Sequence, residues 1–245
     1  MISVVIPALN EEQTVGDVVR GVKGALAQSG MTAEVIVVDG GSTDATTRQA
    51  EVAGARVLRY AGMGKGWCVR QGMKAARGET LVLMDSDGQD VPSELPGLVR
   101  ALSSSGADFV SGSRFLGTFL DRGIAPIDRW GNRALTGLAN ALNRTRLSDI
   151  NASYRAIRVQ ALTGISWDFM EFEIESEMIL KAVRSGLQVL EVPVTRERRL
   201  GGVRKFTKVR QGLRILRTIL QVSLFWGPEG RNRADGPGSA SPPHA

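Results

Sequence analysis

The 245-residue sequence contains very little cysteine or histidine. Cys68 is its single cysteine, and its single histidine, His244, lies in a C-terminal segment rich in glycine, proline and serine. One cysteine excludes an intramolecular disulfide and a paired-cysteine redox or zinc site. A core without histidine excludes a Ser-His-Asp triad. Any catalysis must therefore use carboxylates, lysine and arginine side chains, backbone amides or a hard metal ion held by oxygen atoms.

Long hydrophobic runs are also scarce. The first apolar run is interrupted at Pro7 and follows no basic segment, so it does not predict a signal peptide. We expect a cytoplasmic protein. Positive charge is in excess, because 31 Lys and Arg against 25 Asp and Glu give a net charge of +6. This net positive charge favours an anionic partner, and nucleic acid, a membrane surface and a phosphorylated substrate are the three candidates.

The first 115 residues alternate β-branched runs with helix-like stretches. Strands are predicted at 2–6, 35–38, 55–59, 80–84 and 108–111, and helices at 11–28, 44–53, 65–76 and 93–104. Two runs, VIVV and LVLM, are continuously apolar, which predicts a sheet covered on both faces. We therefore expect an α/β fold, a mostly parallel central sheet flanked by helices that binds ligands at the carboxyl ends of its strands.

The second half of the chain has a looser pattern. A helix is predicted at 126–143, a loop and strand at 149–158, a helix at 172–185 and a strand at 187–192. Apolar residues at three- and four-residue steps then predict a C-terminal basic amphipathic helix over 206–226, with Phe206, Val209, Leu213, Leu216 and Leu220 on its apolar side. The segment 227–245 has little to bury and is expected to be disordered.

Carboxylates follow two of the predicted strands. Asp85 and Asp87 come directly after LVLM, with Gln89 close behind, and Asp39 follows VIVV. An all-oxygen group of this kind suits Mg²⁺ or Mn²⁺, although Asp and Gly are also ordinary turn residues. Ser42, Thr43 or Asp44 can cap the next helix, so a capped turn explains this stretch except for Asp39. The Asp39 carboxylate can accept hydrogen bonds from a nucleobase or from ribose hydroxyls. Lys65 lies in a glycine-rich stretch that matches no phosphate-loop pattern, and it is expected at a helix start facing an anionic cleft.

Eight motifs occur in a fixed order: VVIPALNEE, VVDGGSTDAT, GKG, DSDGQDVP, SGSRFLG, DINASYRAIR, the spacing from Glu177 to Glu191-Val-Pro, and RLGGVRK. In this order they resemble the inverting glycosyltransferases of family 2, and within it the dolichyl-phosphate mannose or glucose synthase branch. The resemblance covers residues 2 to about 217. It implies a GT-A fold that moves a hexose from a UDP- or GDP-sugar to a polyprenyl phosphate, with Mg²⁺ or Mn²⁺ at the Asp-x-Asp motif.

The resemblance also assigns roles to residues. It places Pro7, Ala8, Asn10, Glu11 and Asp39 around the nucleoside, Asp85, Asp87 and Gln89 at the metal and diphosphate, Arg114 at a donor or acceptor phosphate, Arg199 and Lys205 in a phosphate clamp, and Asp149, Tyr154 and Arg155 on the sugar and acceptor side. Our binding set also includes Lys65, and our catalytic candidates are Asp87, Asp149 and Glu177. The sequence departs from the family pattern at Leu9, where many relatives have Tyr, at Gly40, which replaces a second Asp, and at Arg204, which replaces the clamp's Ser.

The need for a general base depends on the acceptor. A phosphate monoester is nucleophilic at neutral pH and hardly needs a base, whereas an alcohol needs a carboxylate to take its proton. Glu175, Glu177 and Asp149 are then the candidates. The two glutamates are equally explained as acids on the first turns of a helix, where the helix dipole favours them.

The basic helix is expected to lie on a membrane surface rather than to cross the bilayer, because each basic residue near the bilayer centre costs about 2.5–3.5 kcal/mol. Packing against the domain with a solvated basic face is the alternative. We divide the chain into a nucleotide-sugar-binding half (1–115), an acceptor-side half of the same domain (116–200), a clamp and amphipathic helix (201–226) and a tail (227–245). A soluble or natural-product hydroxyl acceptor remains an alternative. Nucleic acid is not expected, since aromatic residues make up only 5% of the chain.

Overall fold

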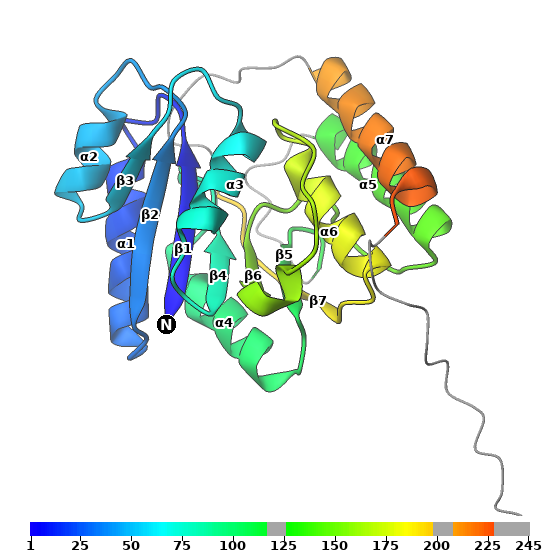
Figure 1. The fold of residues 1–245 in the computed structure, drawn as a ribbon, viewed down its shortest axis with the longest axis horizontal. Coiled ribbons are helices and arrows are strands. Elements are labelled where there is room, and N and C mark those ends of the chain that lie inside the picture. The colour runs from blue at the N-terminus through cyan, green and yellow to red at the C-terminus, as the bar shows by residue number, and fades with distance from the viewer. Residues whose placement is uncertain (117–125, 198–207, 228–245) are drawn as a thin grey trace, which may run out of the picture.

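The structure is a computed structural model that describes residues 1–116, 126–197 and 208–227. Within these residues seven strands form one sheet in the order β3-β2-β1-β4-β6-β5-β7 (Figure 1). The strands are β1 (Ile2–Ala8), β2 (Ala33–Asp39), β3 (Arg56–Arg59), β4 (Thr80–Leu83), β5 (Phe109–Ser113), β6 (Arg155–Arg158) and β7 (Val189–Pro193). The helices are α1 (Val15–Gln28), α2 (Thr46–Val52), α3 (Lys65–Ala75), α4 (Leu95–Ser104), α5 (Pro126–Asn143), α6 (Ile174–Arg184) and α7 (Lys208–Phe225), with short 3₁₀ turns η1 (Pro92–Glu94) and η2 (Val159–Leu162).

The sheet is mostly parallel, as predicted. β1 pairs in parallel with β2 and β4, β2 with β3, and β5 with β7, whereas β6 runs antiparallel between β4 and β5. Because β6 runs the opposite way, the residues that precede it lie at the carboxyl end of β4. The structure therefore brings the 149–154 loop next to the carboxylates that follow β4.

Both faces of the sheet are covered, which explains the continuously apolar strands. Side chains alternate across a strand, so Val4 and Ile6 of β1 pack in the core with α1 and α4, while Val5 packs in the core that contains α3 and α6. All three side chains are fully buried. The prediction of a doubly covered α/β sheet is confirmed.

Two helices begin later than predicted because side chains near their starts stabilise turns. The first helix begins at Val15 rather than at residue 11, and the Thr14 hydroxyl donates to the Ser86 carbonyl at 2.7 Å. The second begins at Thr46, whose backbone N–H donates to Asp44 at 2.9 Å. Of these two hydrogen bonds, the local one between Thr46 and Asp44 competes with helix formation. The first of them ties the loop after β1 to the carboxylate loop after β4.

Helix α7 confirms the predicted basic helix but packs through a different stripe. Its buried apolar residues are Ile215, Ile219 and Val222, which face α5 and α6. The predicted apolar side is largely exposed: Leu213 is 62% accessible and Leu220 is 37% accessible. The helix has two apolar stripes. The periodicity found the one that contains Leu213 and Leu220, and only the stripe of Ile215, Ile219 and Val222 packs in the core. Phe206 lies outside the described residues.

Candidate active site

A cavity of about 450 Å³ opens at the carboxyl edge of the sheet. Its lining comes from the loops after β1, β2 and β4, from the start of α3 and from the segment before α6: Pro7, Ala8, Leu9, Glu11, Gly40, Gly41, Gly62, Met63, Gly64, Lys65, Cys68, Asp85, Ser86, Asp87, Glu171 and Phe172. Its volume is within the range of small-molecule sites, and it combines apolar walls with a few charged groups. Of the residues predicted around a nucleoside, Pro7, Ala8 and Glu11 line it.

Asp39 and Asn10, the other two residues predicted around the nucleoside, do not line the cavity and instead make contacts within the neighbouring loops. Asp39 is almost fully buried and accepts hydrogen bonds from the Ser42 backbone N–H and hydroxyl and from the Thr47 hydroxyl. Asn10 has a left-handed backbone (φ 54°), and its side-chain oxygen accepts from the Thr43 N–H at 2.8 Å. These contacts join the loops after β1 and β2. The turn after β2 thus holds the Asp39 carboxylate in place, and its contact with a nucleoside stays a prediction.

Lys65 is buried against two carboxylates at the cavity wall. Its Nζ lies 2.6 Å from Asp85 Oδ1, makes a short ion pair with Glu175, and is 5.3 Å from the centre of the Phe172 ring. Burial alone would lower the pKa of Lys65, but the two carboxylates outweigh it and raise that pKa. Burial likewise opposes the charge of Asp85, and Lys65 with Arg196 holds the pKa of Asp85 well below its usual range. Lys65 thus holds the Asp85 carboxylate in place at the cavity wall.

Glycines let α3 approach closely enough for this contact. A Cβ on Gly66 would lie 2.6 Å from the Phe169 carbonyl oxygen, and the Trp67 N–H donates to the Met170 carbonyl at 3.1 Å. The glycines next to Lys65 therefore serve close packing against the 169–171 loop. In the same way, a Cβ on Gly40 would lie 2.8 Å from the Met63 carbonyl oxygen, so this loop conformation leaves no room for the second Asp of the family pattern.

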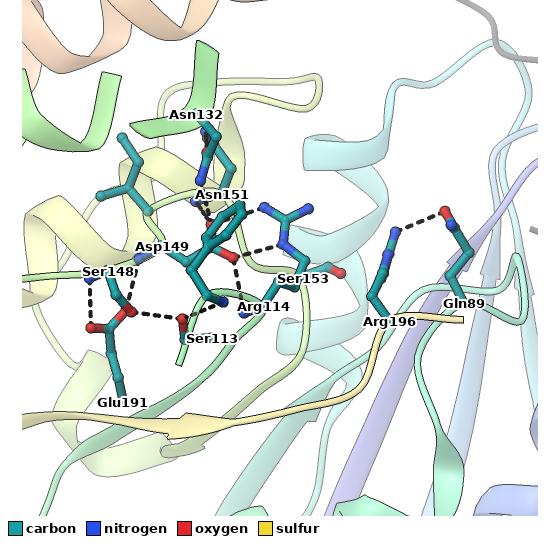
Figure 2. Close-up of polar contacts among 12 residues, drawn as sticks. Gln89, Ser113, Arg114, Asn132, Ser148, Asp149, Asn151, Ser153, Glu191 and Arg196 are labelled. Carbon is teal, nitrogen blue, oxygen red and sulfur yellow. Dashed lines mark hydrogen bonds and ion pairs between the residues drawn. The ribbon is translucent and has the colours of Figure 1, made fainter. Parts of the chain in front are cut away.

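The carboxylates after β4 face a guanidinium. Arg196 lies 3.6 Å from Asp85, 3.9 Å from Asp87 and 2.5 Å from Asp90. It also donates to the Gln89 side-chain oxygen at 3.0 Å (Figure 2). Burial and the charge of Asp85 raise the pKa of Asp87, and Arg196 only partly opposes them. The structure thus brings the three predicted metal-site residues to one place, together with a cation that the motifs did not indicate.

This donor set fits a divalent cation. The described part of the chain holds no group of three or more His, Cys, Asp or Glu side chains arranged for a metal. Asp85, Asp87 and Gln89 supply two carboxylates and an amide oxygen, which suits Mg²⁺ or Mn²⁺ because these ions keep several waters and bind substrate phosphates. The Arg196 guanidinium lies 3.6 and 3.9 Å from the carboxylates of Asp85 and Asp87, so a positive group already faces these oxygens.

Arg114 and Asp149, predicted at a phosphate and as a catalytic acid or base, form a buried ion pair (Figure 2). The Asp149 carboxylate also accepts from Asn132 Nδ2 and the Asn151 N–H, each at 3.1 Å. Burial alone would raise the pKa of Asp149, but Arg114 outweighs it and lowers that pKa. Glu191 positions this loop by accepting from the backbone N–H of Asp149 at 3.0 Å.

Glu177, the third catalytic candidate, lies away from the cavity. Its fully buried carboxylate makes an ion pair with Lys181 at 2.6 Å and accepts from the N–H groups of Asp168 and Phe169 at 2.7 and 3.1 Å. These contacts give it a structural role in holding the 168–169 loop. Lys181 lies four residues along the same helix, and this spacing was the sequence signal for the pair.

Arg155 and Tyr154 also have structural surroundings. Arg155 is fully buried beneath Asp85 and Glu175, and burial lowers its pKa to about 10. The Tyr154 hydroxyl donates to the Val91 carbonyl at 3.2 Å. The predicted clamp residues Arg199 and Lys205 lie outside the described residues.

Comparison with known proteins identifies the family. Residues 3–165 match the family described as Glycosyl transferase family 2. The chain belongs to this family. It is 32% identical over 251 residues to the polyprenol monophosphomannose synthase of Mycolicibacterium smegmatis, and this alignment covers 95% of the chain and 89% of that relative. The predicted family and enzyme class are therefore confirmed.

Other relatives of this glycosyltransferase are longer. The low-salt glycan biosynthesis hexosyltransferase Agl6 of Haloferax volcanii is 32% identical over 201 residues, which cover 82% of the chain and 48% of Agl6. The dolichol-phosphate mannosyltransferase of Pyrococcus furiosus is 28% identical, over 79% of the chain and 56% of that enzyme. The chain thus spans about half the length of these two relatives.

Solved structures confirm the predicted GT-A fold of the glycosyltransferase. The glucosyl-3-phosphoglycerate synthase of Mycobacterium tuberculosis, in complex with Mn²⁺, UDP-glucose and phosphoglyceric acid, superposes with a TM-score of 0.71 at 25% identity. The match covers 91% of this chain and 79% of that one. Among the residues that the structure describes, no helix has the length and apolar character needed to cross a membrane.

The motifs missed four residues around the glycosyltransferase site. Glu171 and Phe172 line the cavity, and Arg196 faces the carboxylates. Glu175, which the sequence suggested only as a candidate base, makes an ion pair with Lys65. Arg196 precedes the RLGGVRK motif by only a few residues, and its place in a basic run was its only signal. The contacts of these residues are long-range, so no local spacing reveals them.

Proposed function

We propose that this glycosyltransferase moves a hexose, with inversion, from a nucleoside-diphosphate sugar to a polyprenyl phosphate. Its site would use a divalent cation held by Asp85, Asp87 and Gln89. The observation that carries the proposal is the cavity, whose apolar walls end at these oxygen ligands on the carboxyl edge of the sheet. The similarity to a polyprenol monophosphomannose synthase and a dolichol-phosphate mannosyltransferase supports the choice of acceptor.

The chemistry requires charge stabilisation at the leaving diphosphate. A bound divalent cation supplies it by neutralising the negative charge that develops on the phosphate oxygens. The chain's own residues keep the carboxylates in place: Lys65 orients Asp85, and the Gln89 N–H donates to Asp87 Oδ1 at 3.1 Å. Such preorganisation is a large part of the stabilisation that a polar site provides.

A phosphate acceptor agrees with the surroundings of the acidic residues. Both oxygens of Asp149 accept hydrogen bonds from Arg114. The Glu177 carboxylate is occupied by Lys181 and by the backbone N–H groups of residues 168 and 169. Glu175, the third candidate base, makes an ion pair with Lys65. We therefore assign none of these three carboxylates as a base. A phosphate monoester needs no such base, whereas a hydroxyl acceptor does.

Peripheral membrane contact is part of the proposal, and α7 supports it. Its outer face exposes Leu213, Leu220, Leu224 and Phe225 alongside the exposed Arg217. Apolar side chains can enter the interface of an anionic bilayer, and each nearby basic residue adds about 1 kcal/mol. Helix α5, which packs beside α7 (Figure 1), also exposes the apolar residues Ile127 and Trp130.

A thermal-shift panel tests the donor and the cation. UDP-, GDP- and dTDP-hexoses are added with and without Mn²⁺ to the wild type and to Asp87→Ala. We expect one base class to raise the Tm in a Mn²⁺-dependent way, and we expect the variant to lose this shift. An equal shift in Asp87→Ala would reject the assigned cation site. Transfer to a short-chain polyprenyl phosphate and to the corresponding free alcohol then separates the two acceptor classes.

Vesicle sedimentation tests the membrane face. The double variant Leu213→Gln/Leu220→Gln should bind vesicles that contain phosphatidylglycerol about 10-fold more weakly, because two apolar side chains no longer enter the interface. Val52→Gln is the matched control, since Val52 is 74% accessible but lies on α2. Equal binding by all three proteins would remove α7 from the proposal.

A further inference from the structure

Arg196 occupies an unusual position for a residue beyond the end of β7. Its guanidinium reaches the loop after β4, where it contacts Asp85, Asp87 and Asp90. It also donates to the Gln89 side-chain oxygen (Figure 2). Its side chain is 11% accessible. The oxygens that would hold a divalent cation are therefore already neutralised by a positive group of the chain itself.

The two arms of the guanidinium have different partners. NH1 makes the close ion pair with Asp90 at 2.5 Å, whereas NH2 lies 3.6 and 3.9 Å from the carboxylates of Asp85 and Asp87 and donates to Gln89 at 3.0 Å. NH2 thus shares all three of the proposed cation ligands. Asp90 is not one of those ligands, so a cation can displace NH2 while the NH1 contact remains.

The backbone keeps Arg196 near the site. Asp90 and Arg196 form an antiparallel β-bridge, the Glu197 N–H donates to the Gln89 carbonyl at 2.9 Å, and Gln89 Nε2 donates to the Glu197 carbonyl at 3.0 Å. These contacts hold residues 196–197 against residues 89–90. A cation that enters must therefore compete with a tethered guanidinium rather than with solvent.

Lys65 does not compete in this way. It approaches Asp85 through the other carboxylate oxygen, Oδ1, and its second partner is Glu175, which is not a proposed cation ligand. Arg196 faces Asp85 Oδ2 and Asp87 Oδ2. Arg196 is therefore the cation that faces an oxygen of both Asp85 and Asp87, where a divalent cation would be held.

We propose, on the basis of the function proposed above, that Arg196 is a built-in counter-ion that sets the cation affinity of the site. It keeps affinity for a free divalent cation low. When a nucleoside diphosphate binds, its oxygens supply further cation ligands and a new partner for the displaced NH2 arm. Cation and nucleotide then bind cooperatively, and the linkage between them is reciprocal.

Mn²⁺ titration of the full chain, followed by the electron paramagnetic resonance signal of free Mn²⁺, tests this proposal. Without nucleotide, Arg196→Gln should bind Mn²⁺ at least about 10-fold more tightly than the wild type, whereas Arg196→Lys and the exposed-surface control Arg100→Gln should bind like the wild type. UDP or GDP should tighten Mn²⁺ binding strongly in the wild type and much less in Arg196→Gln. Adding Asp87→Asn to Arg196→Gln should abolish the gain.

Mn²⁺ affinity in Arg196→Gln that equals or falls below that of the wild type would overturn the proposal. If this variant is less stable because Asp90 loses its partner, the proposal requires Mn²⁺ to raise its Tm more than that of the wild type. The absence of that larger rise also overturns it. The proposed function has a separate readout. It fails if the wild type binds no Mn²⁺ even with nucleotide, whereas nucleotide-dependent binding without tightening in Arg196→Gln rejects only the role of Arg196.

Discussion

Arg114 and Asp149 form a buried bidentate ion pair, in which Arg114 Nε donates to Oδ2 at 2.6 Å and NH2 donates to Oδ1 at 2.8 Å. The two residues lie 35 positions apart in the sequence, one after β5 and the other before β6. The pair therefore fastens together two loops at the carboxyl edge of the sheet. Asn132 of α5 joins the same carboxylate, which links α5 to this edge.

Asp149→Asn should destabilise the protein by about 3 kcal/mol, because it leaves the buried Arg114 without its counter-ion. Asp17→Asn is the matched control: it removes an ion pair with Arg20 in which both side chains are more than half exposed. That change should cost less than about 1 kcal/mol. Urea unfolding followed by circular dichroism measures both. Similar losses in the two variants would contradict the stabilising role of the buried pair.

The same pair predicts how stability depends on pH. Arg114 lowers the pKa of Asp149 in the folded chain below the unfolded value of about 3.9. This carboxylate therefore contributes stability that is fully present above pH 4 and is lost as the pH falls through its folded pKa. The difference in urea midpoint between the wild type and Asp149→Asn should narrow as the pH falls below the unfolded pKa of about 3.9. A constant difference over this range would show that Asp149 does not titrate with folding.

Lys65→Met should lower the turnover number for the nucleotide sugar by about 100-fold. The variant releases Asp85 from Glu175, and misplacement of a site group by about 1 Å costs a factor of this order. Lys74→Met is the matched control, because Lys74 is an exposed lysine on the same helix. Steady-state kinetics measure the effect, and near-ultraviolet circular dichroism confirms folding. Equal turnover in both variants would remove Lys65 from the site.

The sequence predicted the layered sheet well because hydrophobic periodicity reports burial directly. Val4 and Val5 point to opposite faces, and only a sheet covered on both sides buries both. It also placed Asp85 and Asp87 correctly at a strand end. It did not predict Arg196, whose partners lie about 106 residues away, because contacts at that separation depend on the order of the strands. Strand order has no local signature.

A glycine comparison tests the packing that positions Lys65. Gly66→Ala should destabilise the protein by about 1–3 kcal/mol, because the new methyl group would lie 2.6 Å from the Phe169 carbonyl oxygen and force α3 or the 169–171 loop to move. Gly24→Ala, within α1, meets nothing within 4 Å and should stabilise by up to about 1 kcal/mol through helix propensity. Thermal unfolding should therefore shift in opposite directions for the two variants. Because Lys65 precedes Gly66, the Gly66→Ala variant should also lose activity as α3 is displaced. Full activity in a destabilised Gly66→Ala would show that this packing does not position Lys65.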